Sequence, residues 1–206
     1  RDWSSDVCSS DLQRNCLSPE NTEAPPALAG DRDHPRLAIV LSHPTQYYSP
    51  WFRFIQARSG IELRVFYLWD FGVTRQTDRQ FGTAVHWDVD LLSGYESEFV
   101  PNASADPGTH HFRGLNNPDL TRRLAVWEPD AVLLFGYTWL SHLRVVRWAR
   151  LHGVPLIFRG DSHFIGRGPP SLAKRFLLRL LYRQFRAFLA VDRKSTRLNS
   201  SHVALS

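Results

Sequence analysis

Short apolar runs recur along the chain, and segments with the composition of helices separate them. Residues 37–41, 131–135 and 154–158 are the clearest runs, and none contains a charged side chain. Continuous apolar runs of this length are typical of strands buried on both faces of a sheet. Strands that alternate with helices predict parallel βαβ units with right-handed crossovers. We therefore predict an α/β fold with a Rossmann-like, doubly wound, mostly parallel sheet.

The segments between these runs complete the pattern. We expect helices over residues 49–58, 119–127, 138–152 and 169–185, and further strands over 61–69, 98–100 and 187–191. Ser49 and Asp119 are residue types that cap helix N-termini, and Gly153 is typical of a helix end. Residues 70–92 and 102–117 contain several glycines and polar residues, so we expect long loops there, the first with one short strand.

Composition excludes several classes of protein. The chain has 206 residues, of which 43% are hydrophobic, which is enough for one domain of ordinary size. No apolar run reaches the length of a membrane span, and two cysteines make neither a disulfide framework nor a zinc site. Phosphate-binding glycine motifs are absent, which argues against an NAD enzyme or a P-loop NTPase. The arginines are spread throughout a chain of net charge +5, so we do not expect nucleic-acid binding.

The two ends of the chain share an origin at the level of DNA. Most of residues 1–12 and 192–206 can be translated from one DNA segment read in its two directions, as a ligated sequencing adapter would produce. We expect both ends to be adapter-derived and exclude them from the fold. Residues 13–36 are rich in proline, alanine and acidic residues, which predicts a disordered leader. Residues 37–191 would then be one truncated domain of a longer protein.

Ligands of a doubly wound sheet bind beyond the carboxyl ends of its strands. His43, Gln46 and Tyr47 follow the first predicted strand, and Gly136 and Tyr137 follow the strand at 131–135. An imidazole in such a position can hydrogen-bond a substrate hydroxyl or orient a phosphate. Glutamine and tyrosine add the stacking faces and polar tips that sugar sites need. The alternative for His43 is a turn residue that hydrogen-bonds only to backbone.

A second polar group follows the strand at 154–158. Arg159, Asp161 and Ser162 can contact hydroxyls or phosphates, and Gly160 permits close approach of the backbone. The alternative is an internal Arg159–Asp161 pair on a solvated loop. Asp161, Ser162 and His163 are adjacent in the chain, and three adjacent residues cannot take up the geometry of a Ser-His-Asp relay. We therefore do not expect a hydrolase triad here.

No metal site is predicted. The acidic and histidine residues of the 70–92 loop fit no known ligand spacing, and His110 and His111 are expected to be solvated in their loop.

Residues 172–186 carry five basic side chains among leucines and phenylalanines. A basic amphipathic helix of this kind can lie on an anionic membrane surface. The alternative is a helix that packs against the sheet and turns its basic face to solvent. The sequence does not decide between them.

The quoted motifs resemble a known family. The run LAIVLSHPTQYYSP at 37–50, followed by DFG at 70–72 and WDV at 87–89, looks like the amino-terminal half of bacterial glycosyltransferase family 4 proteins. The run GVPLIFRGDS at 153–162 is similar to the same group.

This resemblance implies a GT-B fold, in which two Rossmann-like domains face each other across a cleft. The first domain would bind the acceptor and the second the nucleotide-sugar. The implied reaction is a metal-independent, retaining transfer of a sugar to a hydroxyl of a glycan or lipid-linked acceptor, in polysaccharide or glycolipid synthesis. No cofactor is implied beyond the nucleotide-sugar co-substrate.

The positions of the candidate residues after the strands, taken with the resemblance, lead us to assign roles. We expect catalytic roles for His43 and Asp161, and substrate contacts from Gln46, Tyr47, Gly136, Tyr137, Arg159 and Ser162. The donor-binding half is not among these residues, so we expect the chain alone to be inactive.

We expect a cytoplasmic protein, peripheral at the inner face of the membrane. Two other functions stay open: a GT-B sugar-nucleotide epimerase, for which only Asp161 is well placed as an acid or base, and a non-enzymatic α/β binding module.

Overall fold

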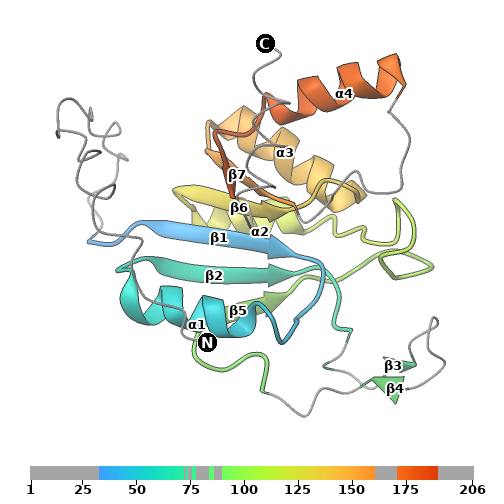
Figure 1. Cartoon of the computed structure of the whole chain (residues 1–206). Coiled ribbons are helices and arrows are strands. Elements are labelled where there is room, and N and C mark those ends of the chain that lie inside the picture. The colour runs from blue at the N-terminus through green and yellow to red at the C-terminus, as the bar shows by residue number, and fades with distance from the viewer. Residues whose placement is uncertain are drawn as a thin grey trace, which may run out of the picture. The chain divides into compact units, whose positions relative to one another are not determined.

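Figure 1 shows a computed structural model of the chain, which describes residues 33–71, 73, 76–77, 84–85, 90–160 and 171–189. The predictions for leader residues 13–32, for the two ends of the chain, and for Asp161 and Ser162 fall outside these residues. The last four residues of the predicted leader are described, and Arg36 already begins the first strand, so the predicted boundary at residue 36 is wrong.

Six strands and four helices make up the described core. The strands of the main sheet are β1 (Arg36–Leu41), β2 (Glu62–Tyr67), β5 (Glu96–Phe99), β6 (Ala131–Phe135), β7 (Leu156–Arg159) and β8 (Ala187–Leu189). The helices are α1 (Ser49–Arg58), α2 (Leu120–Trp127), α3 (Leu140–His152) and α4 (Leu172–Tyr182). Within the 70–92 loop, β3 (Gln76–Thr77) and β4 (Ala84–Val85) form an antiparallel pair, where one short strand was expected.

The main sheet is parallel at every pairing, in the order β5-β2-β1-β6-β7-β8. When only these strands are counted along the chain, the order is the 3-2-1-4-5-6 arrangement of the Rossmann fold. The predicted fold class is therefore confirmed. The chain reverses its direction of travel across the sheet between β1 and β6, and this is the topological switch point at which ligands of such folds bind.

The central strand shows why the apolar runs predict the sheet so well. Ile39 of β1 lies opposite Val65 of β2 and Leu133 of β6, and all three are buried. The edge strand β5 has the polar sequence ESEF, and its Glu96 pairs with Arg64 of β2. The prediction placed this strand at 98–100, two residues late at its start, because a solvent-exposed edge needs no apolar run.

Helices cover both faces of the sheet, and each face has its own core (Figure 1). On one face, Phe52 of α1 packs with Ile39 and Tyr67. On the other face, α2 and α3 contribute Leu124 and Val145 to a larger cluster. No helix in the described part of the chain is long and apolar enough to cross a membrane.

Neither predicted N-cap acts through its side chain. The Ser49 hydroxyl is buried and lies within hydrogen-bond distance of the Leu91 carbonyl, at 2.8 Å, so Tyr48 occupies the cap position of α1. The Asp119 carboxylate instead pairs with Arg122 and Arg123 in the first turns of α2. The predicted end of α3 is confirmed, because Gly153 lies just beyond it in the left-handed conformation, with φ +69°.

The amino-terminal edge of the sheet is held by one arginine. The Arg36 amide donates to Asp130 at 2.7 Å, and its Nε donates to Glu62 at 2.8 Å. One terminal nitrogen donates to the Trp127 carbonyl at 3.0 Å. Arg36 therefore links the starts of β1 and β2 to the end of α2 and to the turn that precedes β6.

Candidate functional site

The carboxyl ends of β1, β6 and β7 lie level with one another. Val40 pairs with Leu134, and Phe135 pairs with Arg159, so the three strands finish at the same height. Adjacent strands are about 4.8 Å apart, which places the segments after β1 and β7 within roughly 10 Å of each other. The candidate site is the edge of the sheet formed by the carboxyl ends of β1, β6 and β7, which includes the switch point.

His43 follows β1 and is largely enclosed by side chains. Its Nδ1 shares a hydrogen bond of 3.0 Å with the hydroxyl of Ser42. The rings of Trp69 and Phe71 meet the imidazole edge-to-face, at centroid distances of 6.1 and 5.6 Å. Burial lowers the pKa of His43, so the ring is neutral at neutral pH. One ring nitrogen is then an acceptor and the other a donor.

The turn between β1 and α1 carries the other residues predicted beside His43. The amide of Tyr48 donates to the Thr45 carbonyl at 3.2 Å, which closes the turn. Gln46 is partly exposed and Tyr47 is exposed. Both side chains are accessible at the edge of the sheet, as a ligand contact would require.

Arg159, the last residue of β7, has an aromatic environment. Its guanidinium carbon lies 5.0 Å from the ring centre of Tyr48, 5.3 Å from Trp51 and 5.4 Å from Phe135. Its Nε is buried and has no hydrogen-bond partner among the described residues. Cation–π contacts hold the charge in place but satisfy none of the guanidinium's hydrogen-bond donors.

Gly136 and Tyr137 follow β6 and play different parts. Gly136 has φ +86°, a conformation that favours glycine, and its amide donates to the Arg159 carbonyl at 2.9 Å. The Tyr137 ring packs against Phe158 and Tyr182, at centroid distances of 6.1 and 5.8 Å. Tyr137 thus belongs to the core on the α2–α3 face, whereas Arg159 lies on the α1 face.

The structure therefore divides the predicted residues into two groups along the edge. His43 lies with Trp69 and Phe71, and Arg159 lies with Tyr48 and Trp51. Tyr48 was expected in the polar turn after β1. Trp51, Trp69 and Phe71 were not predicted as site residues, because they resemble core positions of a helix and a strand end. Their only signal in the sequence is an unusual density of aromatic residues next to the strand ends.

This arrangement can hold a polar ligand with an anionic group. A neutral imidazole exchanges hydrogen bonds with hydroxyls, and an arginine with unused donors binds phosphate or carboxylate oxygens. The aromatic faces beside both groups suit the apolar face of a sugar ring.

No protein-family model matches the chain, and no curated protein matches it. The strand order defines the class: a Rossmann-like α/β domain, with the candidate site beside its topological switch point.

Proposed function

We propose that this chain is the acceptor-side domain of a glycosyltransferase that transfers a sugar from a nucleotide-sugar to a hydroxyl of a glycan or lipid-linked acceptor. The observation that carries the proposal is Arg159. It is a cation at the switch-point edge, held by three aromatic rings, with a buried Nε that no described residue satisfies. A buried donor without a partner costs about 1–3 kcal/mol, which a bound anion would recover.

Each group of the candidate site has a role in this proposal. The Arg159 guanidinium binds a phosphate of the lipid-linked acceptor or of the donor. The neutral His43 imidazole accepts a hydrogen bond from the acceptor hydroxyl, which orients the hydroxyl oxygen towards the donor. Gln46 and Tyr47 contact the sugar. Asp161 and Ser162 stay predictions of a catalytic and a substrate-contacting residue.

Ligand binding tests this proposal without requiring turnover. Isothermal titration of the purified chain with glucose 1-phosphate and with UDP-glucose measures whether a sugar phosphate binds. Replacing Arg159 by leucine should weaken binding by about 10- to 100-fold, because a hydrogen bond to a charged group contributes about 1.5–3 kcal/mol. Arg147→Leu removes an exposed arginine from α3 and should leave binding unchanged. Equal affinity of Arg159→Leu and the unmodified chain would contradict the proposal.

We also propose a contact between α4 and an anionic membrane surface, which the exposed side chains of this helix support. Four apolar side chains of α4 are exposed by between 42% and 81%: Leu172, Phe176, Leu177 and Leu180. Only its last turn, with Leu181 and Tyr182, packs against the core. Lys174, Arg175 and Arg179 lie among the exposed apolar positions. An exposed apolar stripe with basic neighbours is the pattern of helices that bind anionic lipid surfaces, and it would place the protein at the inner face of the membrane.

Vesicle co-sedimentation tests this contact. The chain should bind vesicles that contain phosphatidylglycerol more strongly than vesicles of phosphatidylcholine alone. The double variant R175E/R179E should lose this preference. The variant R147E/R150E makes the same change of net charge on α3 and should keep it. If both variants lose binding equally, net charge rather than α4 is responsible.

A further inference from the structure

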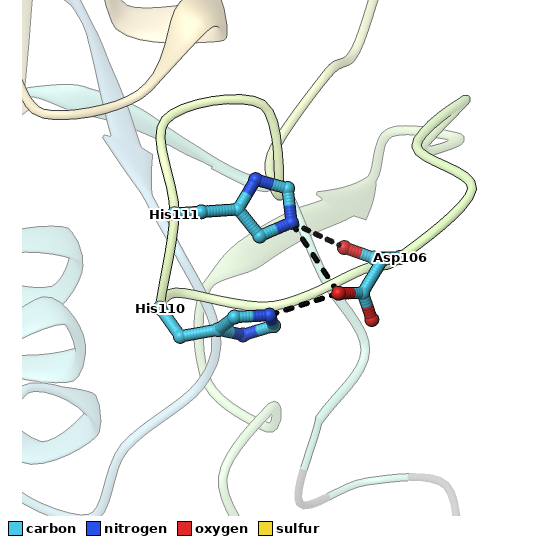
Figure 2. Close-up of side chains that lie close together, drawn as sticks. All are labelled: Asp106, His110 and His111. Carbon is cyan, nitrogen blue, oxygen red and sulfur yellow. Dashed lines mark hydrogen bonds and ion pairs between the residues drawn. The ribbon is translucent and has the colours of Figure 1, made fainter.

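Three side chains from one loop converge outside the candidate site (Figure 2). His110 Nε2 lies 3.0 Å from the carboxylate of Asp106, and His111 Nε2 lies 3.6 Å from the same oxygen. The three ligand atoms all lie within 4.8 Å of one another. His111 Nε2 also lies 3.0 Å from the main-chain oxygen of Asp106. Both histidines are partly exposed to solvent, as expected, and the loop in addition directs both towards one carboxylate.

The loop that carries these residues is built to close at this point. The amide of Gly108 donates to the carbonyl of Gly114 at 3.2 Å, and a Cβ atom at Gly114 would collide with the carbonyl oxygen of Gly108. A Cβ atom at Gly108 would come within 2.6 Å of Nδ1 of His110. The Asn102 side chain also donates to the Gly114 carbonyl, at 2.8 Å. Both glycines are needed for this path, so the three side chains converge through the fold of the loop.

We propose that Asp106, His110 and His111 bind a zinc ion through the carboxylate and the two Nε2 atoms. Zinc prefers four ligands in a tetrahedron, with bonds of about 2.0–2.1 Å to nitrogen and oxygen, which makes the ligand atoms about 3.3 Å apart. The carboxylate oxygen lies 3.0 Å from His110 Nε2 and 3.6 Å from His111 Nε2, on either side of that value. A neutral histidine pair with one carboxylate is a ligand set that zinc accepts, and it leaves a fourth position for water.

The three groups are also reachable by an ion. Their side chains are between 38% and 50% exposed, so the ion can enter from solvent with its water ligand in place. Without a metal, the Asp106 carboxylate accepts a hydrogen bond from His110, and the Asp106 main-chain oxygen accepts one from His111. With zinc, each of the three groups donates a lone pair, and both histidines move their ring protons to Nδ1.

The zinc site is connected to the candidate site through α3. The Leu140 amide at the start of α3 donates to the Phe112 carbonyl at 3.0 Å, and the Trp139 indole donates to the Thr109 carbonyl at 3.3 Å. Gly136 and Tyr137 lie just before this helix start. Zinc would therefore fix the loop that carries its ligands, and this loop is hydrogen-bonded to the connection between β6 and α3. The proposal stands independently of the glycosyltransferase function.

Titration of the EDTA-treated, full 206-residue chain with zinc tests the site, with a chromophoric chelator as competitor. We expect one zinc per chain. Loss of an outer-sphere partner typically lowers zinc affinity 10- to 100-fold, so loss of a ligand in H110Q or H111Q should lower it by at least about tenfold. D106N should do the same. His34→Gln alters an exposed histidine elsewhere and should leave the affinity unchanged.

Cobalt(II) distinguishes this site from the cysteines at positions 8 and 16. Cobalt bound by histidine and carboxylate in four-coordinate geometry gives visible absorption bands without the near-ultraviolet thiolate charge-transfer band. Those visible bands should vanish in H110Q/H111Q, with the far-ultraviolet circular dichroism unchanged. The absence of saturable zinc binding, or equal affinity in H110Q/H111Q, would overturn the proposal and leave a hydrogen-bonded loop only. A thiolate spectrum would likewise overturn it.

Discussion

His142 is a buried histidine in the first turn of α3, and its side chain is fully enclosed. Its ring lies edge-to-face against Trp139 at 5.0 Å, and neither ring nitrogen has a hydrogen-bond partner among the described residues. Burial lowers the pKa of His142 to about 3. The ring is therefore neutral in the folded protein across the whole range in which an unfolded histidine becomes charged.

This residue predicts an acid-sensitive fold. Between pH 6.5 and pH 3 the unfolded chain binds a proton at His142 and the folded chain does not, so the free energy of unfolding falls as the pH falls. The slope from this group approaches about 1.4 kcal/mol per pH unit within that window. Urea unfolding at several pH values between 7 and 4.5 measures it.

The matched variant is His142→Leu, which removes the titrating group and places an apolar side chain in the same buried position. Its unfolding free energy should depend less on pH than that of the unmodified chain, and the difference between the two should widen towards pH 4.5. The remaining dependence comes from the carboxylates and from His43, whose pKa burial also lowers. Parallel pH profiles of the two proteins would contradict the assignment.

Individual site residues could be predicted from the sequence where their position after a strand determines their surroundings. His43 and Arg159 could be predicted at the edge because they directly follow apolar strands. The partners of Arg159 could not, because Tyr48 and Trp51 come from a different segment and meet it only after α1 docks. The convergence of His110 on Asp106 was missed for a related reason, since it depends on the path of a loop between two glycines.

Asn117 joins separate elements at the end of the sheet. It is fully buried, and its side-chain nitrogen lies 2.8–3.1 Å from the carbonyl oxygens of Leu68, Val100 and Pro101. Its side-chain oxygen accepts from Ser141 of α3 at 2.9 Å. One amide thereby links the segments after β2 and β5 to the first turn of α3.

Replacing Asn117 by alanine should lower the free energy of unfolding by at least about 2 kcal/mol, because several buried polar groups lose their partners together. Asn116→Ala is the control. Asn116 is partly exposed, and its side-chain oxygen accepts a hydrogen bond from Arg144, so the expected cost is about 1 kcal/mol or less. Chemical denaturation compares the two variants, and equal costs would contradict the linking role.

Two glycines in loops should resist substitution by alanine for different reasons, one for its backbone conformation and the other for lack of space. Gly153 beyond α3 has φ +69° and open space around its Cβ position, so Gly153→Ala should cost about 1–2 kcal/mol. At Gly114 a Cβ atom would strike the backbone of Gly108, so Gly114→Ala should cost more. Differential scanning calorimetry of the two variants tests this ranking.

Among the helices and strands, the buried strands were predicted more accurately than the exposed ones. The runs at 37–41, 131–135 and 154–158 became β1, β6 and β7 with small shifts at their ends, because strands buried on both faces must be apolar. The edge strand β5 and the β3–β4 pair were less well predicted, since neither depends on a continuous apolar sequence. Neither expected cap forms through its side chain: the Ser49 hydroxyl makes a tertiary contact with Leu91, and the Asp119 carboxylate, although at the cap position of α2, pairs with arginines of the same helix.

The two cores of the molecule lie on opposite faces of the sheet. Ile39 and Leu133 belong to the face covered by α1, and Leu124 belongs to the face covered by α2 and α3. Substitutions that share no packing partners have additive effects, usually within about 0.5 kcal/mol. The sheet between the faces should therefore make the two cores energetically separable.

Ile39→Val should cost about 0.5–1.5 kcal/mol and Leu124→Ala about 2–5 kcal/mol, and the double variant should show their sum. Ile39→Val with Leu133→Val is the comparison, because these residues are neighbours in the same core. That pair should deviate from additivity. A large coupling energy between Ile39 and Leu124 would show that the two faces relax together.

The hydrogen bonds of Arg36 gather at the end of the sheet opposite the candidate site. Stability at one end and the proposed ligand contacts at the other involve different residues of the same strands. Loops beyond β1, β6 and β7 can therefore diverge in length and chemistry while the opposite end keeps the strands in register. A domain built in this way can acquire a new specificity through changes in its loops while it keeps the same fold.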